Sequence, residues 1–436
     1  MTYQETIDYL YSQLPMFQRI GGAAYKADLS TTLKLDEYFN HPHKKFASIH
    51  VAGTNGKGSV SHMLATVFQQ AGYKTGLYTS PHLLDFRERI KINGQMIPED
   101  EVVKWVEQHK SIFANLKPSF FEMTVALSFD YFERQKIDIA IIEVGMGGRL
   151  DSTNIITPKL SVITNIGFDH TQFLGNSLID IAKEKGGIIK TNVPVVVGEN
   201  NSETLPVFKQ LADKVNTKLI VADQQYRILD EFNYEAGIKT FKVESVPTNE
   251  RYIVELDLLG NYQRKNILTF LTALNEACKI LDINFKESLK SVKHTASTTG
   301  LMGRWQVLKR KPYIVTDIAH NTNGMAEIID HIKTIKHESL HMVLGVVNDK
   351  DIDSMLSLLP QNTKFYFTQP SIPRALNYEK LYDSAKVFGL EGEKHPKVEF
   401  AIESAINKSQ QNDIIYIGGS AFVVADALQY WNTIEE

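Results

Sequence analysis

The 436-residue chain is long enough for more than one domain, and its 43% apolar content can fill sizeable cores. Its formal net charge of −4 provides no excess of positive charge for binding nucleic acid. The single cysteine, Cys278, excludes an internal disulfide and is consistent with a reducing compartment. Its apolar, helical surroundings predict a packing role.

The N-terminal 40 residues predict two short helices. The opening stretch MTYQETIDYLYSQL is polar and amphipathic, without the cationic and apolar parts of a signal peptide. No run of 18 apolar residues follows. We therefore expect a soluble, cytoplasmic protein with neither a membrane nor a nucleic-acid partner. Gly21 and Gly22 predict a break before a second helix around Leu29–Phe39.

The stretch Lys45–Val60, KFASIHVAGTNGKGSV, predicts a glycine-rich turn between a buried strand and a helix. Glycines let backbone N–H groups converge on a phosphate, and Lys57 adds a positive charge. Ser59 is placed to ligate Mg²⁺. The usual phosphate-loop order is altered, because Val51 replaces the first glycine and Gly58 separates the lysine from the serine. The alternative is a glycine-rich turn without a ligand.

Strands and helices alternate between residues 46 and 200. The expected strands are continuous apolar runs, which are typical of parallel strands buried on both faces. After the phosphate-loop strand they lie at 75–78, 137–144, 159–164 and 194–198. Short β-rich pieces at 218–221, 240–243 and 252–258 predict an antiparallel flap on the edge of the sheet, followed by a long helix over 262–281.

A small, polar stretch, Thr295–Gly300, predicts a flexible linker. Beyond it a second alternation begins, with a helix that carries Met325, Ile328, Ile329 and Ile332 on one face. The expected strands lie at 313–316, 342–347, 364–368, 397–400 and 414–417. We therefore predict an α/β protein with two domains, 1–296 and 297–436, the second being a smaller parallel α/β domain.

Polar residues follow three of the predicted strands. Ligands of open α/β sheets bind at the carboxyl ends of strands, so these residues are candidates for a site. Ser80 follows the strand at 75–78, Glu143 ends the next one, and His170 lies beyond 159–164. Together they can hold a divalent cation, although each one alone fits a structural role in a turn.

Several motifs together resemble folylpolyglutamate synthase, a branch of the Mur-ligase superfamily that includes bifunctional dihydrofolate synthases. The motifs span residues 45–325: HVAGTNGKGS, YTSPHL, FRERIKING, FFEMT, EVGMGGRLDSTN, ITNIGFDH, IAKEKGGIIK, GRW and DIAHN. The resemblance implies an N-terminal Mur-ligase-like P-loop ATPase domain with a parallel central sheet. It also implies a smaller C-terminal Rossmann-like glutamate-ligase domain, with the active site between the two.

The resemblance also implies an ATP-dependent acid–amino-acid ligase. The γ-phosphoryl group of ATP passes to the terminal carboxylate of a folate, and the amine of L-glutamate then attacks the acyl phosphate. The implied partners are ATP, L-glutamate and a reduced folate or dihydropteroate, with Mg²⁺ as cofactor, in two ions, and a monomeric enzyme. Ser152 replaces the alanine of many dihydrofolate-synthesising relatives, so the activity on dihydropteroate stays open.

The same resemblance assigns roles to individual residues. Ser80 and Glu143 hold one magnesium ion, His170 holds the other, and Lys185 becomes a carbamate. Without the resemblance, Lys185 is simply the charged end of a helix with a glycine cap. The nucleotide residues are Gly53, Thr54, Asn55, Gly56, Lys57, Gly58, Ser59, Asn266, Arg304 and Asp317. The folate residues are His82, Phe121, Glu122 and Asp151, and the glutamate residues are Arg89, His320 and Ser420. The catalytic residues are Lys57, Lys185 and His320.

Some of these assignments have structural alternatives. Phe121 opens an apolar helix, Asp151 fits a cap of the following turn, and Arg89 in its charged run fits a solvated face. Ile318 departs from the glycine usual in the DGAHN motif, which affects the turn that carries Asp317. Two other functions stay open: a cell-wall Mur ligase acting on a UDP-sugar peptide, and a nucleotide-hydrolysing switch protein.

Overall fold

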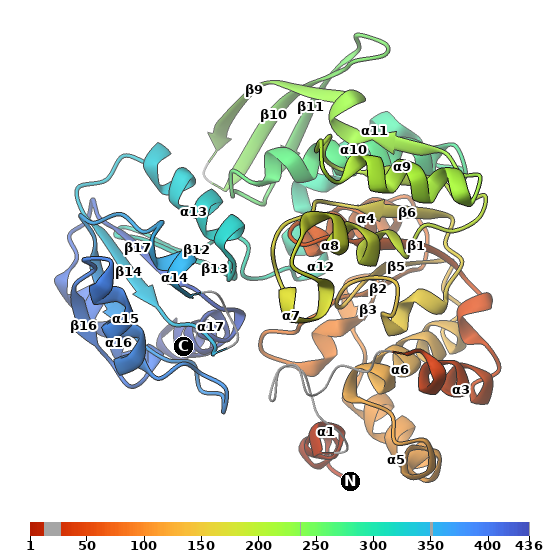
Figure 1. The fold of residues 1–436 in the computed structure, drawn as a ribbon, viewed down its shortest axis with the longest axis horizontal. Coiled ribbons are helices and arrows are strands. Elements are labelled where there is room, and N and C mark those ends of the chain that lie inside the picture. The colour runs from red at the N-terminus through yellow and green to blue at the C-terminus, as the bar shows by residue number, and fades with distance from the viewer. Residues whose placement is uncertain (13–27, 236, 349–351, 436) are drawn as a thin grey trace. The chain divides into compact units, whose positions relative to one another are not determined.

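The computed structural model describes residues 1–12, 28–235, 237–348 and 352–435, which form two compact units (Figure 1). The first unit comprises Met1–Asp257 and Gln263–Leu301, and the second comprises Leu258–Tyr262 and Met302–Glu436. The chain therefore passes between the units three times. The predicted division after Ala296 falls inside the first unit, and the predicted Gly21–Gly22 break lies outside the described residues.

The first unit is built on an eight-stranded sheet of order β4-β3-β2-β5-β1-β6-β7-β8. The strands from β2 to β8 pair in parallel, and the two short strands at the β4 edge pair antiparallel. The continuous apolar runs are buried, as predicted, because helices cover both faces. The strands are β1 (Ala47–Ala52), β2 (Thr75–Tyr78), β3 (Ile90–Ile92), β4 (Gln95–Met96), β5 (Ile139–Glu143), β6 (Leu160–Ile163), β7 (Val195–Val197) and β8 (Leu219–Val221).

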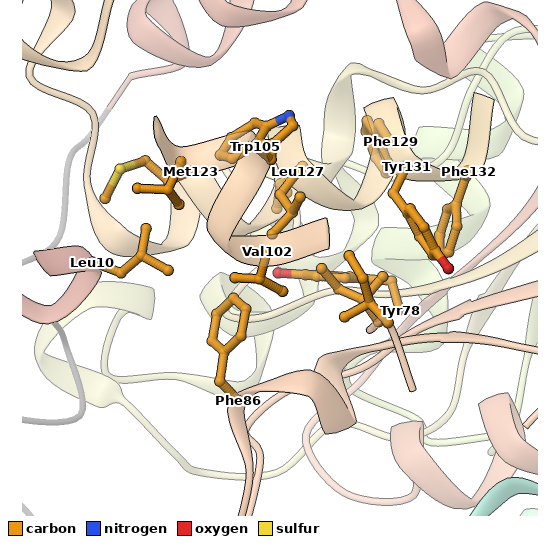
Figure 2. Packing of buried hydrophobic residues seen from close by; sticks show 14 of the residues in the cluster. Leu10, Tyr78, Phe86, Val102, Trp105, Met123, Leu127, Phe129, Tyr131 and Phe132 are labelled. Carbon is orange, nitrogen blue, oxygen red and sulfur yellow. The ribbon is translucent and has the colours of Figure 1, made fainter. Parts of the chain in front are cut away.

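Helices of the first unit cover this sheet. In one apolar core, Trp105 and Val102 lie close to Leu127 of the neighbouring helix, above Tyr78 of β2 (Figure 2). The helices are α1 (Tyr3–Ser12), α3 (Ser30–Tyr38), α4 (Lys57–Gln70), α5 (Glu99–Leu116), α6 (Phe120–Arg134), α7 (Thr171–Leu174), α8 (Leu178–Gly186), α9 (Leu205–Lys214), α10 (Gln263–Cys278), α11 (Phe285–Ser291) and α12 (Thr295–Thr299).

A separate three-stranded antiparallel sheet has the order β11-β10-β9. Its strands are β9 (Tyr226–Glu235), β10 (Ile238–Ser245) and β11 (Arg251–Leu256). The prediction that 218–221 belongs to this flap was wrong, because β8 pairs in parallel with β7 and extends the main sheet. The third strand of the flap is instead the charged strand β9, with the sequence YRILDEFNYE.

The predicted linker 295–300 was also wrong, because its first five residues form α12. Both ends of this short helix are tied down. The Asp257 carboxylate accepts from the N–H groups of Ala296 and Ser297, and Lys91 Nζ donates to Thr299 O at 2.7 Å. Gly300 follows in the left-handed conformation, with φ 66°, that ends a helix. The small polar residues of this segment therefore form a helix rather than a solvent-exposed linker.

The second unit has a six-stranded sheet of order β12-β13-β17-β14-β15-β16. The five strands from β13 to β16 pair in parallel, and β12 pairs antiparallel at the edge. The strands are β12 (Gln306–Arg310), β13 (Tyr313–Asp317), β14 (Leu340–Leu344), β15 (Lys364–Phe367), β16 (Gly392–Lys394) and β17 (Ile414–Gly418). The helices are α13 (Thr322–Thr334), α14 (Ile352–Leu356), α15 (Tyr378–Val387), α16 (Val398–Lys408) and α17 (Ala421–Glu435).

The strand predicted at 397–400 is wrong, because α16 begins at Val398. Its buried residues recur at helical spacing, at Val398, Ala401, Ile402 and Ala405. The window of four residues was too short to show this period. Among the helices that the structure describes, none combines the length and the apolar character needed to cross a membrane.

Cys278 ends α10 and is half-buried. Burial raises the pKa of its thiol to about 11. Its thiol is therefore protonated at neutral pH and unreactive, in agreement with a packing role.

Candidate active site

The glycine-rich turn lies between β1 and α4, as the sequence predicts. Gly53 has φ 146° and Gly56 has φ 86°, both of which disfavour residues with a side chain. Space is equally restrictive, because a Cβ at Gly53 would lie 1.9 Å from Thr164 Oγ1. A Cβ at Gly56 would lie 2.2 Å from Asn266 Oδ1. The turn is therefore a tight backbone cradle that ends at the positive end of a 14-residue helix.

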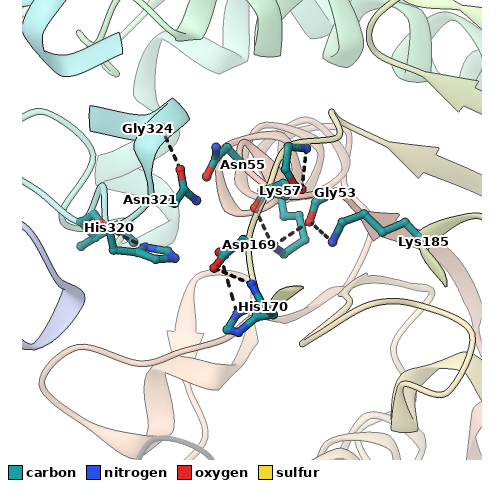
Figure 3. Close-up of polar contacts among 12 residues, drawn as sticks. Gly53, Asn55, Lys57, Asp169, His170, Lys185, His320, Asn321 and Gly324 are labelled. Atoms are coloured by element: carbon teal, nitrogen blue, oxygen red, sulfur yellow. Dashed lines mark hydrogen bonds and ion pairs between the residues drawn. The ribbon is translucent and has the colours of Figure 1, made fainter. Parts of the chain in front are cut away.

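Two lysines converge on this cradle (Figure 3). Lys57 Nζ donates to the carbonyl oxygens of Gly53 and Thr54, at 3.0 and 3.1 Å. Lys185 Nζ, which is buried, donates to the same Gly53 oxygen at 3.0 Å. Burial, followed by the charge of Lys57, lowers the pKa of Lys185 to about 7. This ammonium group therefore loses its proton far more readily than an ordinary lysine does.

The segment after β6 braces the loop, a role that the sequence analysis did not assign. Asn165 Oδ1 accepts from the Asn55 N–H at 2.8 Å, and Thr164 Oγ1 donates to Asn55 O at 2.6 Å. The Thr54 hydroxyl donates to Gly167 O at 3.0 Å. The ITNIGFDH motif contains these residues, so their polar side chains next to a strand end were the available signal.

The start of α10 contacts the other side of the loop. Gln263 Nε2 donates to Ser59 Oγ at 3.1 Å, and Asn266 Nδ2 donates to Gln263 Oε1 at 2.8 Å. The predicted nucleotide residue Asn266 thus belongs to the same site as Gly53–Ser59. Gln263 was missed, although it stands three residues before Asn266 on the same helix.

The proposed metal ligands follow neighbouring strands. β2, β5, β1 and β6 lie side by side, and Tyr78 pairs with Ile142, next to Glu143, which pairs with Val51. Glu143 is buried at the end of β5, and Ser80 follows β2. Among the described residues no three His, Cys, Asp or Glu side chains are close enough to hold a metal ion. The buried carboxylate and the hydroxyl are nevertheless the hard oxygen donors that Mg²⁺ prefers.

His170 directly precedes α7 and has a left-handed conformation, with φ 51°. Its backbone N–H donates to Asp169 Oδ1 at 2.9 Å, and its Nε2 lies 3.8 Å from Asp169 Oδ2 (Figure 3). The position after β6 agrees with its predicted place at a strand end. Its role as a ligand stays a prediction.

Arg89 is buried, so the alternative of a solvated face is wrong. Its Nε donates to His82 Nδ1 at 2.7 Å, and its guanidinium lies 5.2 Å from the centre of the Phe120 ring. His82 Nε2 lies 3.2 Å from the Tyr11 hydroxyl. Burial, followed by the charge of Arg89, lowers the pKa of His82 well below its usual range, so this ring is neutral. The structure therefore joins a predicted folate residue to a predicted glutamate residue.

Phe121 and Asp151 lie together at Gly145. A Cβ at Gly145 would lie 2.4 Å from Phe121 Cζ and 3.1 Å from Asp151 Oδ2. The Asp151 carboxylate accepts from the N–H groups of Thr153 and Met146, at 3.0 and 2.9 Å. Asp151 therefore caps the turn that follows it, which was the structural alternative.

Glu122 has a defined structural contact as well. Its carboxylate accepts from the Ser119 N–H at 2.7 Å, completing a capping box at the start of α6. Thr32 Oγ1 donates to the same carboxylate at 3.3 Å. Its role in folate binding stays a prediction.

In the second unit, Asp317 is the centre of a buried network. Its carboxylate accepts from Tyr262 Oη at 2.6 Å, from the Trp305 N–H at 2.7 Å and from the Ala319 N–H at 2.8 Å. Burial raises the pKa of Asp317, and the Tyr262 hydroxyl and the charge of Arg304 act against that shift. The Ile318 N–H donates to Gly303 O at 3.1 Å, so the turn accommodates a side chain in place of glycine.

His320 and Ser420 follow two neighbouring strands of the second unit, β13 and β17. His320 Nδ1 lies 3.0 Å from Ile318 O (Figure 3), and Ser420 Oγ accepts from the Val423 N–H at the start of α17, at 3.2 Å. Asn321, next to His320, caps α13 by accepting from the Gly324 N–H at 2.8 Å. Arg304 is half-buried beside Gly303.

Comparison with known proteins places this site in a family. Residues 51–274 match the Mur ligase middle domain, and residues 303–421 match the Mur ligase glutamate ligase domain. The chain is also 31% identical to the dihydrofolate synthase/folylpolyglutamate synthase of Bacillus subtilis, covering 97% of this chain and 98% of that protein. The chain belongs to the folylpolyglutamate synthase/dihydrofolate synthase branch of the Mur ligases.

Solved structures agree with this assignment. A Mycobacterium tuberculosis folylpolyglutamate synthase complexed with ADP and AMPPCP is 26% identical, with a TM-score of 0.86 over 98% of each chain. A bifunctional enzyme from Yersinia pestis, complexed with AMPPNP and a Mn ion, is 24% identical with a TM-score of 0.84, covering 99% of this chain and 98% of that one. The second likeness concerns the fold alone.

Proposed function

We propose that this chain is an ATP-dependent ligase that adds L-glutamate to the terminal glutamate carboxylate of folates through an acyl phosphate. The observation that carries the proposal is the cradle Gly53–Ser59, with Lys57 and Lys185 both on the Gly53 carbonyl. Phosphoryl transfer depends on positioning and charge neutralisation more than on covalent help from the protein. Family membership supplies the class of acceptor.

In this reaction the backbone N–H groups of the loop and Lys57 bind the phosphates of ATP. The folate carboxylate attacks the γ-phosphorus and ADP leaves. The amine of L-glutamate then attacks the carbonyl carbon of the acyl phosphate, loses a proton and displaces inorganic phosphate. Ser80, Glu143 and His170 would hold Mg²⁺, as two ions, which would further neutralise the phosphate oxygens.

Lys185 is proposed to carry a carbamate. The ammonium group first loses one proton. The neutral amine then attacks the carbon of CO₂ and releases a second proton, so that a cation becomes an anion. The pKa of about 7 supports this step, because much of the amine is neutral at physiological pH. Burial, its largest cause, also disfavours leaving a bare ammonium there.

The substrate residues are proposed from the motifs they match and from their place in the structure. His82, Phe121, Glu122 and Asp151 are assigned to the folate, and Arg89, His320 and Ser420 to L-glutamate, with His320 also acting in catalysis. Asn266, Arg304 and Asp317 are assigned to adenosine. The hydrogen bond between Arg89 and His82 supports a connected site in the first unit, in which a folate residue and a glutamate residue lie together.

The test is phosphate release from ATP that requires both a folate and L-glutamate. A switch protein needs neither substrate, and a cell-wall ligase does not respond to folate, so release without folate would overturn the proposal. Supplying tetrahydrofolate and dihydropteroate separately decides whether the chain also joins glutamate to dihydropteroate, which we propose as a second activity.

We further propose that the enzyme is a monomer in the cytoplasm. Its single cysteine suits a reducing compartment. Sedimentation at several protein concentrations tests the monomer, and fractionation of cells that express the chain tests its location.

A further inference from the structure

Gln263 is the fully buried first residue of α10. Its side chain stands between two residues of the nucleotide site, Asn266 on its own helix and Ser59 on α4. The chain enters the first unit at this residue, since Tyr262 belongs to the second unit. Neither the sequence motif roles nor the reaction described above gives Gln263 a function.

The direction of these hydrogen bonds follows from their chemistry. Asn266 Nδ2 is a donor, so the group of Gln263 that it meets is Oε1, and Gln263 Nε2 faces Ser59. The opposite face of Asn266, its Oδ1, lies against Gly56. The two hydrogen bonds therefore point in the same direction along the series Gly56, Asn266, Gln263, Ser59. At its end, Ser59 Oγ accepts a hydrogen bond from the protein.

Receiving this bond restricts the Ser59 hydroxyl. One lone pair of Oγ is occupied by the Gln263 amide, which leaves the second lone pair and the hydroxyl hydrogen for a ligand. A serine on the first turn after a phosphate loop is where a phosphate-bound cation is held. Ser59 is almost fully buried, so its rotamer is set by the protein rather than by water.

We propose that Gln263 is a positioning residue that orients the Ser59 hydroxyl toward the metal ion bound with the nucleotide. The proposal rests on the proposed function, because it requires Mg·ATP at the loop. The proposal also assigns a function to the place where the chain returns to the first unit. The preceding residue, Tyr262, belongs to the second unit, and its hydroxyl donates to the Asp317 carboxylate at 2.6 Å. Tyr262 and Gln263 are consecutive, and each holds a residue assigned to nucleotide binding, Asp317 in the second unit and Asn266 in the first.

The test is calorimetric binding of AMPPNP to the full chain with Mg²⁺ and with EDTA, in the absence of folate. Gln263→Leu keeps a similar volume and removes the amide, so we expect binding with Mg²⁺ to weaken about tenfold, as for the loss of one oriented hydrogen bond. Binding with EDTA should weaken much less, because without the metal only the lost hydrogen bond to Asn266 affects the nucleotide. Equal weakening in both conditions would overturn the proposal.

Three further variants separate positioning from a general loss of structure. Gln263→Glu retains an acceptor for Asn266 and removes the donor to Ser59, so it should reproduce the metal-dependent loss. Its buried carboxylate should lower the melting temperature, so the comparison is made between Mg²⁺ and EDTA within this variant. In a Ser59→Ala background, Gln263→Leu should add nothing; a full additional loss contradicts action through Ser59. Thr272→Ala is the matched control and should bind normally, because Thr272 lies on the same helix and its hydroxyl donates to Leu268 O. Wild type that binds no Mg·AMPPNP would instead refute the proposed function itself.

Discussion

Lys57 and Lys185 donate to one carbonyl oxygen, that of Gly53, each at 3.0 Å. Two ammonium groups on a single acceptor repel one another. This repulsion is relieved when an anion lies between them or when one of them loses its charge. This repulsion supports the proposals that the cradle binds a phosphate and that its two lysines have different tasks.

Lys57→Ala should abolish ligation while leaving the fold intact. Lys57 donates to backbone oxygens of its own loop, so its removal should cost little packing but take away the charge proposed to neutralise the phosphates. Circular dichroism should match wild type, and turnover should fall by at least about a hundredfold. Near-normal turnover would refute the assigned role.

Lys185 should make stability depend on pH in a defined direction. Its pKa is about 7 in the folded chain and near 10.5 when unfolded. Below pH 7 both states carry the charge, and the folded state bears the full cost of burying it. Between about 7 and 10.5 the unfolded chain binds more protons, so this cost is relieved as the pH rises.

Lys185→Met should therefore stabilise the ligand-free protein most below pH 7, by a few kcal/mol at about 1.4 kcal/mol per pKa unit, and less at pH 9. Urea unfolding in bicarbonate-free buffer measures this. Lys183→Met, on the exposed face of the same helix, is the control and should show no such pH dependence. Equal effects of Lys185→Met at pH 6 and pH 9 would contradict the prediction.

Lys185→Ala should lose ligase activity and recover part of it with added short carboxylates such as acetate, which replace the anion of a carbamate. Unmodified Lys185 in a mass spectrum recorded under CO₂, together with no recovery, counts against the carbamate. Formamide, which is similar in size and uncharged, should not restore activity.

His170→Asn should abolish ligation as completely as His170→Ala. Asparagine tolerates the left-handed backbone at this position, so it removes the imidazole without straining the turn. Activity should stay low at saturating Mg²⁺ if the imidazole is required, and the melting temperature should stay near that of wild type. Substantial turnover in the asparagine variant would show that only the turn matters.

Thr153→Val should raise the KM for folate and leave the KM for ATP unchanged. Thr153 Oγ1 donates to Asp151 Oδ1 at 2.5 Å and lies 2.9 Å from Nε2 of the buried His50. This hydroxyl therefore fixes the position of the carboxylate. Asp151 keeps its two backbone donors in this variant, whereas the buried His50 Nε2 loses the hydroxyl, which costs about 1–3 kcal/mol.

Two variants qualify that result. Thr153→Ser keeps the hydroxyl and should behave as wild type. Ser161→Ala, on β6, the strand next to that of His50, removes a buried hydroxyl that donates to Ile188 O. This variant should lower stability without changing either KM. If Ser161→Ala also raises the KM for folate, the effect of Thr153 is one of stability alone.

The sequence predicted most of the parallel strands because apolar runs bounded by glycine and polar turns define them well. It failed where the period was too short to read, as at 397–400, where α16 begins, and where a strand sits at the edge of its sheet, as with β8. Small polar residues at 295–300 were mistaken for a linker, because their tertiary partners Asp257 and Lys91 lie far away in the chain.

The site was less predictable than the fold. Motifs identified the loop and its two lysines, but no pattern indicates that Arg89 is buried against Phe120 or that Gln263 contacts Ser59. These contacts join segments distant in sequence, and long polar side chains are compatible with both exposure and burial. Only the three-dimensional arrangement separates the two.

The short segment Leu258–Tyr262 limits how the molecule can be divided. Leu259 and Tyr262 pack against the core that surrounds Trp305, although more than thirty residues of the other unit lie between them and Met302. A fragment starting at Met302 lacks the hydroxyl that holds Asp317. An isolated C-terminal half must therefore receive this pentapeptide in trans, or by circular rearrangement, before the loop after β13 can adopt its native form.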